Sequence, residues 1–211
     1  MSANEGHATP KRIGIFGGTF DPVHVGHLVA VVNAMHGASL DRVLMVVANV
    51  PWQKERTRAI SPAWVRFALL KASIDGVEGL EASDIEIRRG GKSYTIDTVR
   101  ETKARYPEAE VFLIVGADAA RGLASWERSE RLSELVTLIV VNRPGTSVTS
   151  EELAGWRTLF VEVPAIDISS TDIRARVREH RPLDFLLTRE TIDFIHRSGL
   201  YSEGAEIARE Q

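Results

Sequence analysis

The stretch RIGIFGGTFDPVHVGH (12–27) decides the fold, because its first five residues form an apolar run that stops at two glycines. A run of this kind predicts a buried strand over 12–16 that enters a tight loop. Similar β-branched runs lie at 42–48, 111–116, 137–142 and 159–163. Near-continuous hydrophobicity is typical of parallel strands that are covered on both faces.

Helical patterns separate these runs, at 27–35, 62–73 and 94–106. The alternation of strand and helix predicts an α/β fold with a Rossmann-like, doubly wound parallel sheet. A small C-terminal helical segment follows, with helices expected over 170–179 and 188–198 and hydroxyl residues at both starts. We expect a disordered tail over 1–11, a single domain over 12–201 whose helical part covers about 165–201, and a second tail over 202–211.

The composition excludes several classes of protein. The 211 residues are 44% hydrophobic, which is enough for one domain with a sizeable core. With 26 Lys and Arg against 29 Asp and Glu, the formal charge is −3, so no global basic field favours nucleic acid, and a small anion needs a local site. The chain has no cysteine, no apolar leader at its start and no run long enough for a membrane. These features predict a soluble, cytoplasmic protein, and a homo-oligomer is compatible with them.

The loop after the first run carries most of the functional information. Gly17 and Gly18 allow the backbone to approach a ligand without a side chain in the way. Because a helix is expected to begin near Val25, His24 and His27 should project together from its first turn, where the helix N-terminus favours an anion. We therefore predict that the two imidazoles face a phosphate-bearing ligand.

The segment GGTFDPVHVGH (17–27) resembles the (T/H)xGH signature of the nucleotidylyltransferase superfamily. The resemblance implies that ATP binds on a Rossmann-like sheet, and that His24 and His27 hold its phosphates and stabilise the transition state. It also implies ATP contacts from the rest of the loop, namely Gly17, Gly18, Thr19 and Phe20. In such a reaction the acceptor phosphate attacks the α-phosphorus, so positioning and charge neutralisation are the main tasks.

A second phosphate-binding element lies near the C-terminus, in DISSTDIRAR (167–176). Ser169, Ser170 and Thr171 stand at an expected helix start, and Arg174 follows one turn later, where its guanidinium can grip phosphate oxygens. An ordinary helix cap with a solvated arginine is the alternative. The segment resembles the superfamily motif ISSTxxR, which implies ATP binding by the hydroxyls and catalysis by Arg174. Nothing resembles a carboxylate cage, so we expect no metal ligands in the protein and Mg²⁺ carried mainly by the ATP phosphates.

Two further segments resemble the bacterial nicotinate-nucleotide adenylyltransferase family. KSYTIDTVRE (92–101) is similar to its SYTxDT element, which implies that Thr95 lies near a nicotinate carboxylate. GADAARGLASW (116–126) is similar to GADxxxxxxxW, which implies nucleotide contacts from Gly116 and Asp118 and a stacking role for Trp126 on the pyridine ring. The structural alternatives are a helix cap, a turn and a core aromatic residue. The implied reaction joins AMP from ATP to nicotinate mononucleotide, giving deamido-NAD and pyrophosphate in NAD biosynthesis.

One segment departs from the family pattern. Where the family has a PPHK-like stretch, this chain has PWQK (51–54). Lys54 can still direct positive charge toward a mononucleotide phosphate. Trp52 is expected either to line the acceptor pocket or to cover it.

Three other functions remain open at this point. Pantetheine-phosphate adenylyltransferase shares the HxGH chemistry but lacks the two acceptor elements. A class I aminoacyl-tRNA synthetase fragment would carry a KMSKS-like loop and a more basic surface. A non-catalytic nucleotide sensor would not need His24, His27 and Arg174 together, because such groups matter mainly in the transition state.

Overall fold

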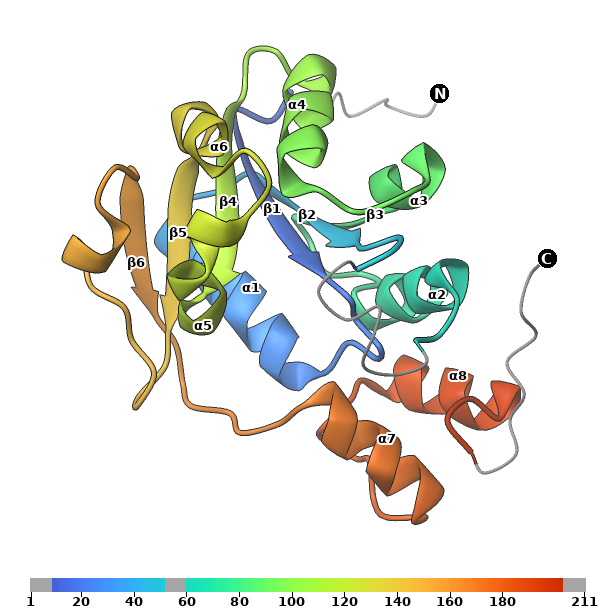
Figure 1. Ribbon diagram of the computed structural model, residues 1–211. Helices are drawn as coiled ribbons and strands as arrows, with labels where there is room; N and C mark the ends of the chain where they lie inside the picture. The colour runs from blue at the N-terminus through green and yellow to red at the C-terminus, as the bar shows by residue number, and fades with distance from the viewer. Residues whose placement is uncertain (1–8, 52–59, 203–211) are drawn as a thin grey trace, which may run out of the picture.

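The computed structural model describes residues 9–51 and 60–202, which form a sheet of six parallel strands with helices packed around it (Figure 1). The strand order is β3-β2-β1-β4-β5-β6. The strands are β1 (Arg12–Gly18), β2 (Arg42–Val47), β3 (Leu80–Ser83), β4 (Glu110–Gly116), β5 (Thr137–Asn142) and β6 (Thr158–Glu162). This order confirms the predicted doubly wound sheet, and its direction of winding reverses between β1 and β4, where such folds bind ligands.

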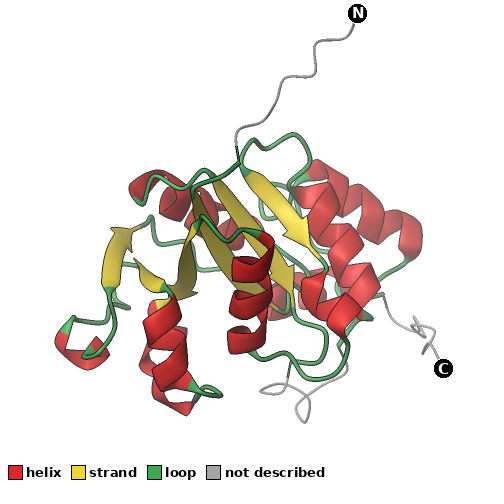
Figure 2. Cartoon of the chain, turned by 90° about the horizontal axis from the view of Figure 1, so that it is seen from above, coloured by secondary structure: helices red, strands yellow, loops and turns green. Residues whose placement is uncertain are grey.

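Helices lie on both sides of the strands, as the view from above shows (Figure 2). They are α1 (Val25–Gly37), α2 (Ala63–Ser73), α3 (Ile85–Arg89), α4 (Thr95–Arg105), α5 (Ala117–Arg121), α6 (Ser129–Leu135), α7 (Ser170–Arg178) and α8 (Arg189–Ser198), with 3-10 turns η1 (Leu123–Ser125) and η2 (Glu151–Leu153). Every predicted helix is present. The sequence did not predict β3, α3, α5 or α6, because four to seven residues are too few to establish a period.

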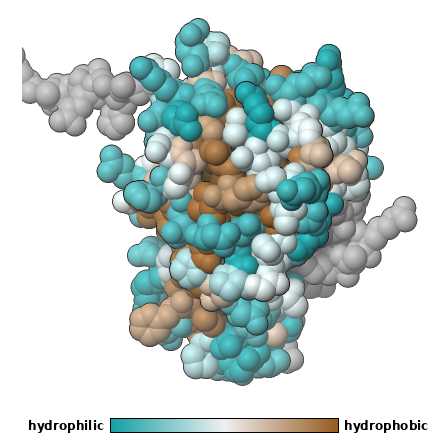
Figure 3. Space-filling model, turned by 90° about the vertical axis from the view of Figure 1, so that its left-hand side faces the viewer, coloured by the Kyte–Doolittle hydropathy of each residue, from teal (hydrophilic) through white to brown (hydrophobic). Residues whose placement is uncertain are grey.

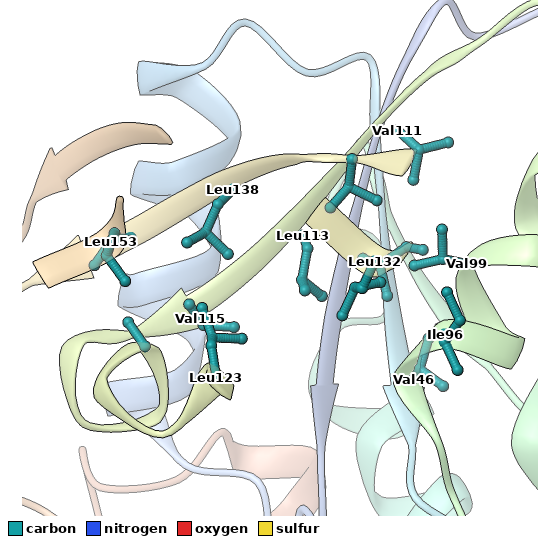
Figure 4. Close-up of a cluster of buried hydrophobic side chains, with 14 of the residues drawn as sticks. Val46, Ile96, Val99, Val111, Leu113, Val115, Leu123, Leu132, Leu138 and Leu153 are labelled. Atoms are coloured by element: carbon teal, nitrogen blue, oxygen red, sulfur yellow. The ribbon is translucent and has the colours of Figure 1, made fainter. Parts of the chain in front are cut away.

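The two faces of the sheet support two separate hydrophobic cores. Side chains alternate along β4, so that Leu113 and its neighbours on one face pack against α4, α5 and α6 (Figure 4). On the opposite face Phe112 and Ile114 pack with residues of α1 and α2, including Val31 and Leu70. The inner strands are covered on both sides, which explains their continuous apolar sequences.

Two strands differ from the sequence prediction. The first strand does not stop before the glycines, because Gly17 and Gly18 remain paired with Val46 and Val47 of β2. The strand at 158–162 is not covered on both faces, since Leu159 is 40% and Phe160 38% exposed. Figure 3 looks onto this side of the molecule and shows apolar side chains among polar ones. Because β6 is an edge strand, it has a neighbour on one side only.

The C-terminal helices lie beyond the carboxyl ends of the strands, below the sheet in Figure 1. A third apolar cluster joins Ile173 of α7 and Ile195 of α8 to Leu69 of α2. Ser169 and Thr188 cap the two helices through their side-chain oxygens, as the sequence predicted. None of the helices in the described ranges is long and apolar enough to cross a bilayer. The cluster places α7 close to the loop that follows β1.

Candidate active site

Two adjoining cavities open at the carboxyl end of the sheet, at the switch between β1 and β4. We call them the histidine cavity, of about 630 Å³, and the tryptophan cavity, of about 300 Å³. The histidine cavity includes Thr19, Phe20, Asp21, His24, His27, Arg143, Ser169, Ser170, Thr171 and Arg174. The tryptophan cavity includes Pro51, Glu86, Ser93, Thr95, Thr98 and Trp126. Phe16, Gly17, Gly18, Thr19 and Gly116 line both, so two ligands in these cavities would meet above β1 and β4.

The two histidines stand at the start of α1 with their rings in contact. The ring centroids of His24 and His27 are 3.8 Å apart. The Nδ1 atom of His27 accepts a hydrogen bond from the backbone N–H of His24, at 3.2 Å. A neutral imidazole that accepts at Nδ1 carries its proton on Nε2. His27 therefore keeps an N–H donor on the opposite side of its ring.

His24 is held in an unusual electrostatic state. Its side chain is 7% exposed, and its Nδ1 atom has no hydrogen-bond partner among the described residues. Burial, followed by the positive charge of Arg143, lowers the pKa of His24 to about 4. The imidazole is therefore neutral near pH 7, and the residue lines the histidine cavity in this state.

Glycines at three positions serve two purposes in this region, either an open surface or close packing. A Cβ atom on Gly17 would meet nothing within 4 Å, so its backbone faces open space, whereas one on Gly18 would lie 2.7 Å from the Phe20 ring. A Cβ atom on Gly26 would lie 3.0 Å from Ile168 and 3.1 Å from Nδ1 of His24. The glycine of the HVGH motif thus permits close packing between α1 and the segment before α7.

Arg174 connects α7 to the segment between β1 and α1 through hydrogen bonds. Its Nη1 atom donates to the backbone oxygen of Asp21 at 2.6 Å, and its Nη2 atom donates to Oγ1 of Thr171 at 3.1 Å. The hydroxyl of Ser170 donates to the backbone oxygen of Pro22 at 2.8 Å. The sequence elements 17–27 and 169–174, far apart in the chain, therefore line one cavity.

Arg143 was not predicted from the sequence, although it lines the histidine cavity. It directly follows β5 (Thr137–Asn142), and a cation at the carboxyl end of a parallel strand is a signal that could have identified it. Asp118 does not line either cavity, and its side chain is 69% exposed. It lies 3.7 Å from the guanidinium of Arg143, so it stands next to the cavity through this ion pair.

The tryptophan cavity is built from a different set of groups. Thr95 is the first residue of α4, and Trp126 follows η1 and packs partly against the core. Glu86 is 7% exposed and was not predicted; it accepts a hydrogen bond from the hydroxyl of Thr98 at 2.5 Å. Arg89 also donates to the Thr98 hydroxyl, at 3.0 Å. A carboxylate without an adjacent motif leaves no signal of its own in the sequence.

Two predicted acceptor residues, Trp52 and Lys54, lie outside the described residues. Among residues 9–51 and 60–202, no group of three or more histidine, aspartate or glutamate side chains is arranged to hold a metal ion. The cationic groups of the histidine cavity instead suit an anion that carries its own metal ion.

Comparison with known proteins identifies the class first. Residues 15–176 match the model of the cytidylyltransferase-like family. A protein of Corynebacterium kroppenstedtii named "Probable nicotinate-nucleotide adenylyltransferase" is 41% identical over 198 residues, or 93% of each chain. A Thermus thermophilus protein of the same name is 40% identical over 190 residues, which cover 90% of this chain and 99% of the relative.

This chain thus belongs to the cytidylyltransferase-like family and, within it, to the nicotinate-nucleotide adenylyltransferases. A solved structure has the same fold: that of the Plasmodium falciparum nicotinic acid mononucleotide adenylyltransferase complexed with NaAD. It has a TM-score of 0.74 at 19% identity and covers 90% of this chain and 97% of its own.

Proposed function

We propose that this enzyme transfers the AMP group of ATP to nicotinate mononucleotide, with release of pyrophosphate and formation of deamido-NAD. The observation that carries the proposal is the pair of adjoining cavities with a shared wall above β1 and β4. ATP occupies the histidine cavity, with its α-phosphate near the shared glycines. The nicotinate nucleotide occupies the tryptophan cavity, so that its phosphate approaches the α-phosphorus from the other side.

In the proposed reaction the protein supplies positioning and charge. The acceptor phosphate oxygen forms a bond to the α-phosphorus while the bond to the bridging oxygen of pyrophosphate breaks. His27 donates from Nε2, and His24, neutral in the free enzyme, lines the same cavity beside it. Arg174 and Arg143 neutralise the charge that develops on the departing pyrophosphate. No covalent intermediate with the protein is needed.

Mg²⁺ enters this proposal as an ion bound to the triphosphate. Mg²⁺ commonly keeps several water ligands and binds nucleotide phosphates directly. The ion would reduce the negative charge of the triphosphate, and the described side chains around it would fix the position of the nucleotide.

The recognition of the acceptor follows from the groups around the tryptophan cavity. Trp126 offers an aromatic face to the cationic pyridine ring, and Thr95, at the start of α4, is suited to the carboxylate. Asp118, which contacts Arg143, would adjust the position of that cation at the ATP site. Nicotinamide mononucleotide would leave donors poorly paired, so nicotinate mononucleotide should be the preferred acceptor.

The test is an assay of pyrophosphate release with ATP, Mg²⁺ and one of three acceptors. We expect kcat/KM for nicotinate mononucleotide to exceed that for nicotinamide mononucleotide by roughly 100-fold. Equal values would contradict carboxylate recognition. Turnover with phosphopantetheine and with neither mononucleotide would contradict the proposal that nicotinate mononucleotide is the acceptor. Absence of pyrophosphate release with all three acceptors would contradict adenylyl transfer.

A further inference from the structure

The last described turn of the chain contacts the loop that carries the histidines. The hydroxyl of Tyr201 donates to Oδ1 of Asp21 at 2.8 Å, across 180 positions of sequence. Both residues are buried, with Asp21 1% and Tyr201 8% exposed. Burial, the negative charge of Asp21 and this hydrogen bond raise the pKa of Tyr201 far above its usual value. Tyr201 is thus a permanent hydrogen-bond donor at physiological pH.

Asp21 occupies a central position in the wall of the histidine cavity. Its Oδ2 atom accepts from the backbone N–H of Ser61 at 3.5 Å. Its backbone oxygen accepts from Arg174, as described above, and His24 follows only three residues later. Asp21 therefore contacts the guanidinium of Arg174 directly and lies in the same short segment as His24.

The Tyr201 ring itself is anchored independently of the cavity. It belongs to the apolar cluster that α8 forms with α2 and α7. Its backbone adopts a φ of 68°, after Gly199 ends α8 in the left-handed region. A tyrosine seldom adopts this conformation, and it persists only when surrounding contacts define it.

We propose that Tyr201 is a positioning residue for adenylyl transfer, acting through Asp21 on Arg174 and the histidine pair. Tyr201 itself lines neither cavity. Its hydroxyl fixes the carboxylate of Asp21. The segment 21–24 then holds the backbone oxygen of Asp21 toward Arg174 and holds His24, with His27 in contact with it, toward the cavity. This inference rests on the function proposed above.

The first test is Tyr201→Phe, which removes the hydroxyl and keeps the ring in its cluster. We expect kcat to fall roughly tenfold while KM for nicotinate mononucleotide changes less than about twofold, since the acceptor cavity is lined by other residues. The matched control is Ser73→Ala. Ser73 forms a buried hydrogen bond with Thr191 between α2 and α8 and donates to the backbone oxygen of Leu69, a residue of the same cluster. It lies outside both cavities.

If Tyr201 were only structural, both variants would lower the melting temperature and neither would change kcat measured well below it. We expect both to lose thermal stability and only Tyr201→Phe to lose kcat. Equal kcat in wild type and Tyr201→Phe would overturn the inference.

The second test is a double-mutant cycle with Asp21→Asn, which keeps the size of the side chain. If Tyr201 acts through Asp21, Tyr201→Phe should reduce kcat much less in the Asp21→Asn background than in wild type. Fully additive losses would overturn the route through Asp21. Failure of the wild-type enzyme to adenylate any acceptor would instead overturn the proposed function, so the two failures are distinguishable.

Discussion

The histidine cavity and the tryptophan cavity share a wall but are assembled in different ways. The first depends on contacts between the two ends of the chain, such as Arg174 with Asp21 and Ser170 with Pro22. The second is lined mainly by residues between 86 and 126, such as Thr95, Thr98 and Trp126. The first concentrates positive charge, and the second offers an aromatic ring and a helix start. The difference suggests that one cavity governs chemistry and the other governs selection of the acceptor.

The largest expected effect comes from the histidines. His24→Ala and His27→Ala should each lower kcat by roughly 100-fold or more, while ATP affinity changes far less, because in the proposed reaction these groups act mainly in the transition state. Steady-state kinetics and calorimetric ATP titration measure the two quantities. His36→Ala is the matched control, since His36 is exposed at the other end of the same helix. Equal losses of ATP affinity and kcat would mean that the two histidines bind the ligand but do not stabilise the transition state.

A smaller effect is expected for the arginine that the sequence did not predict. Arg143→Ala should lower kcat/KM for ATP by roughly 30-fold, because it removes a cation from the histidine cavity. Arg121→Ala is the control, since Arg121 also pairs with Asp118 but does not line either cavity. Similar kinetics for both variants would mean that Arg143 only neutralises the charge of Asp118 and does not act on ATP.

A substitution in the tryptophan cavity should change KM for nicotinate mononucleotide more than kcat. Trp126→Ala should raise KM for nicotinate mononucleotide roughly tenfold and leave kcat within about threefold, because the ring contributes binding that is similar in ground and transition states. Trp64→Ala is the control, as Trp64 is 46% exposed on α2 and outside both cavities. A large fall in kcat would contradict the division between the two cavities.

The smallest effect concerns stability of the free protein. Because the pKa of His24 is lowered to about 4 in the folded state, the unfolded chain takes up a proton on this residue first as the pH falls below 6.5. Folding is therefore penalised progressively from pH 6.5 down to about 4, and the penalty is absent above this window.

At pH 5.5 the penalty should be about 1 kcal/mol relative to pH 7.5. Urea unfolding at both pH values measures it, and the fall in stability should be smaller in His24→Ala by this amount. An identical pH dependence in the two proteins would contradict a buried, neutral His24.

The sequence determined five of the six strands, the longer helices and the locations of the phosphate motifs, because these depend on local periodicity, glycine turns and helix starts. The pattern around β1 and α1 was enough to place two imidazoles at one helix start. The sequence did not predict the short elements β3, α3, α5 and α6, because they are too short to show a hydrophobic period. The sequence did not identify Arg143 and Glu86 as site residues, because an isolated charged residue belongs to no motif.

Only the tertiary structure decided which distant groups meet. The contacts of Arg174 and Tyr201 with Asp21 join positions more than 150 residues apart, and no local pattern encodes them. They exist because α7 and α8 bury their apolar faces against α2, which brings the end of the chain to the loop after β1. Hydrophobic burial brings the helices together, but it is not directional and does not set the exact positions of the polar groups they carry. The geometry of the hydrogen bonds sets those positions.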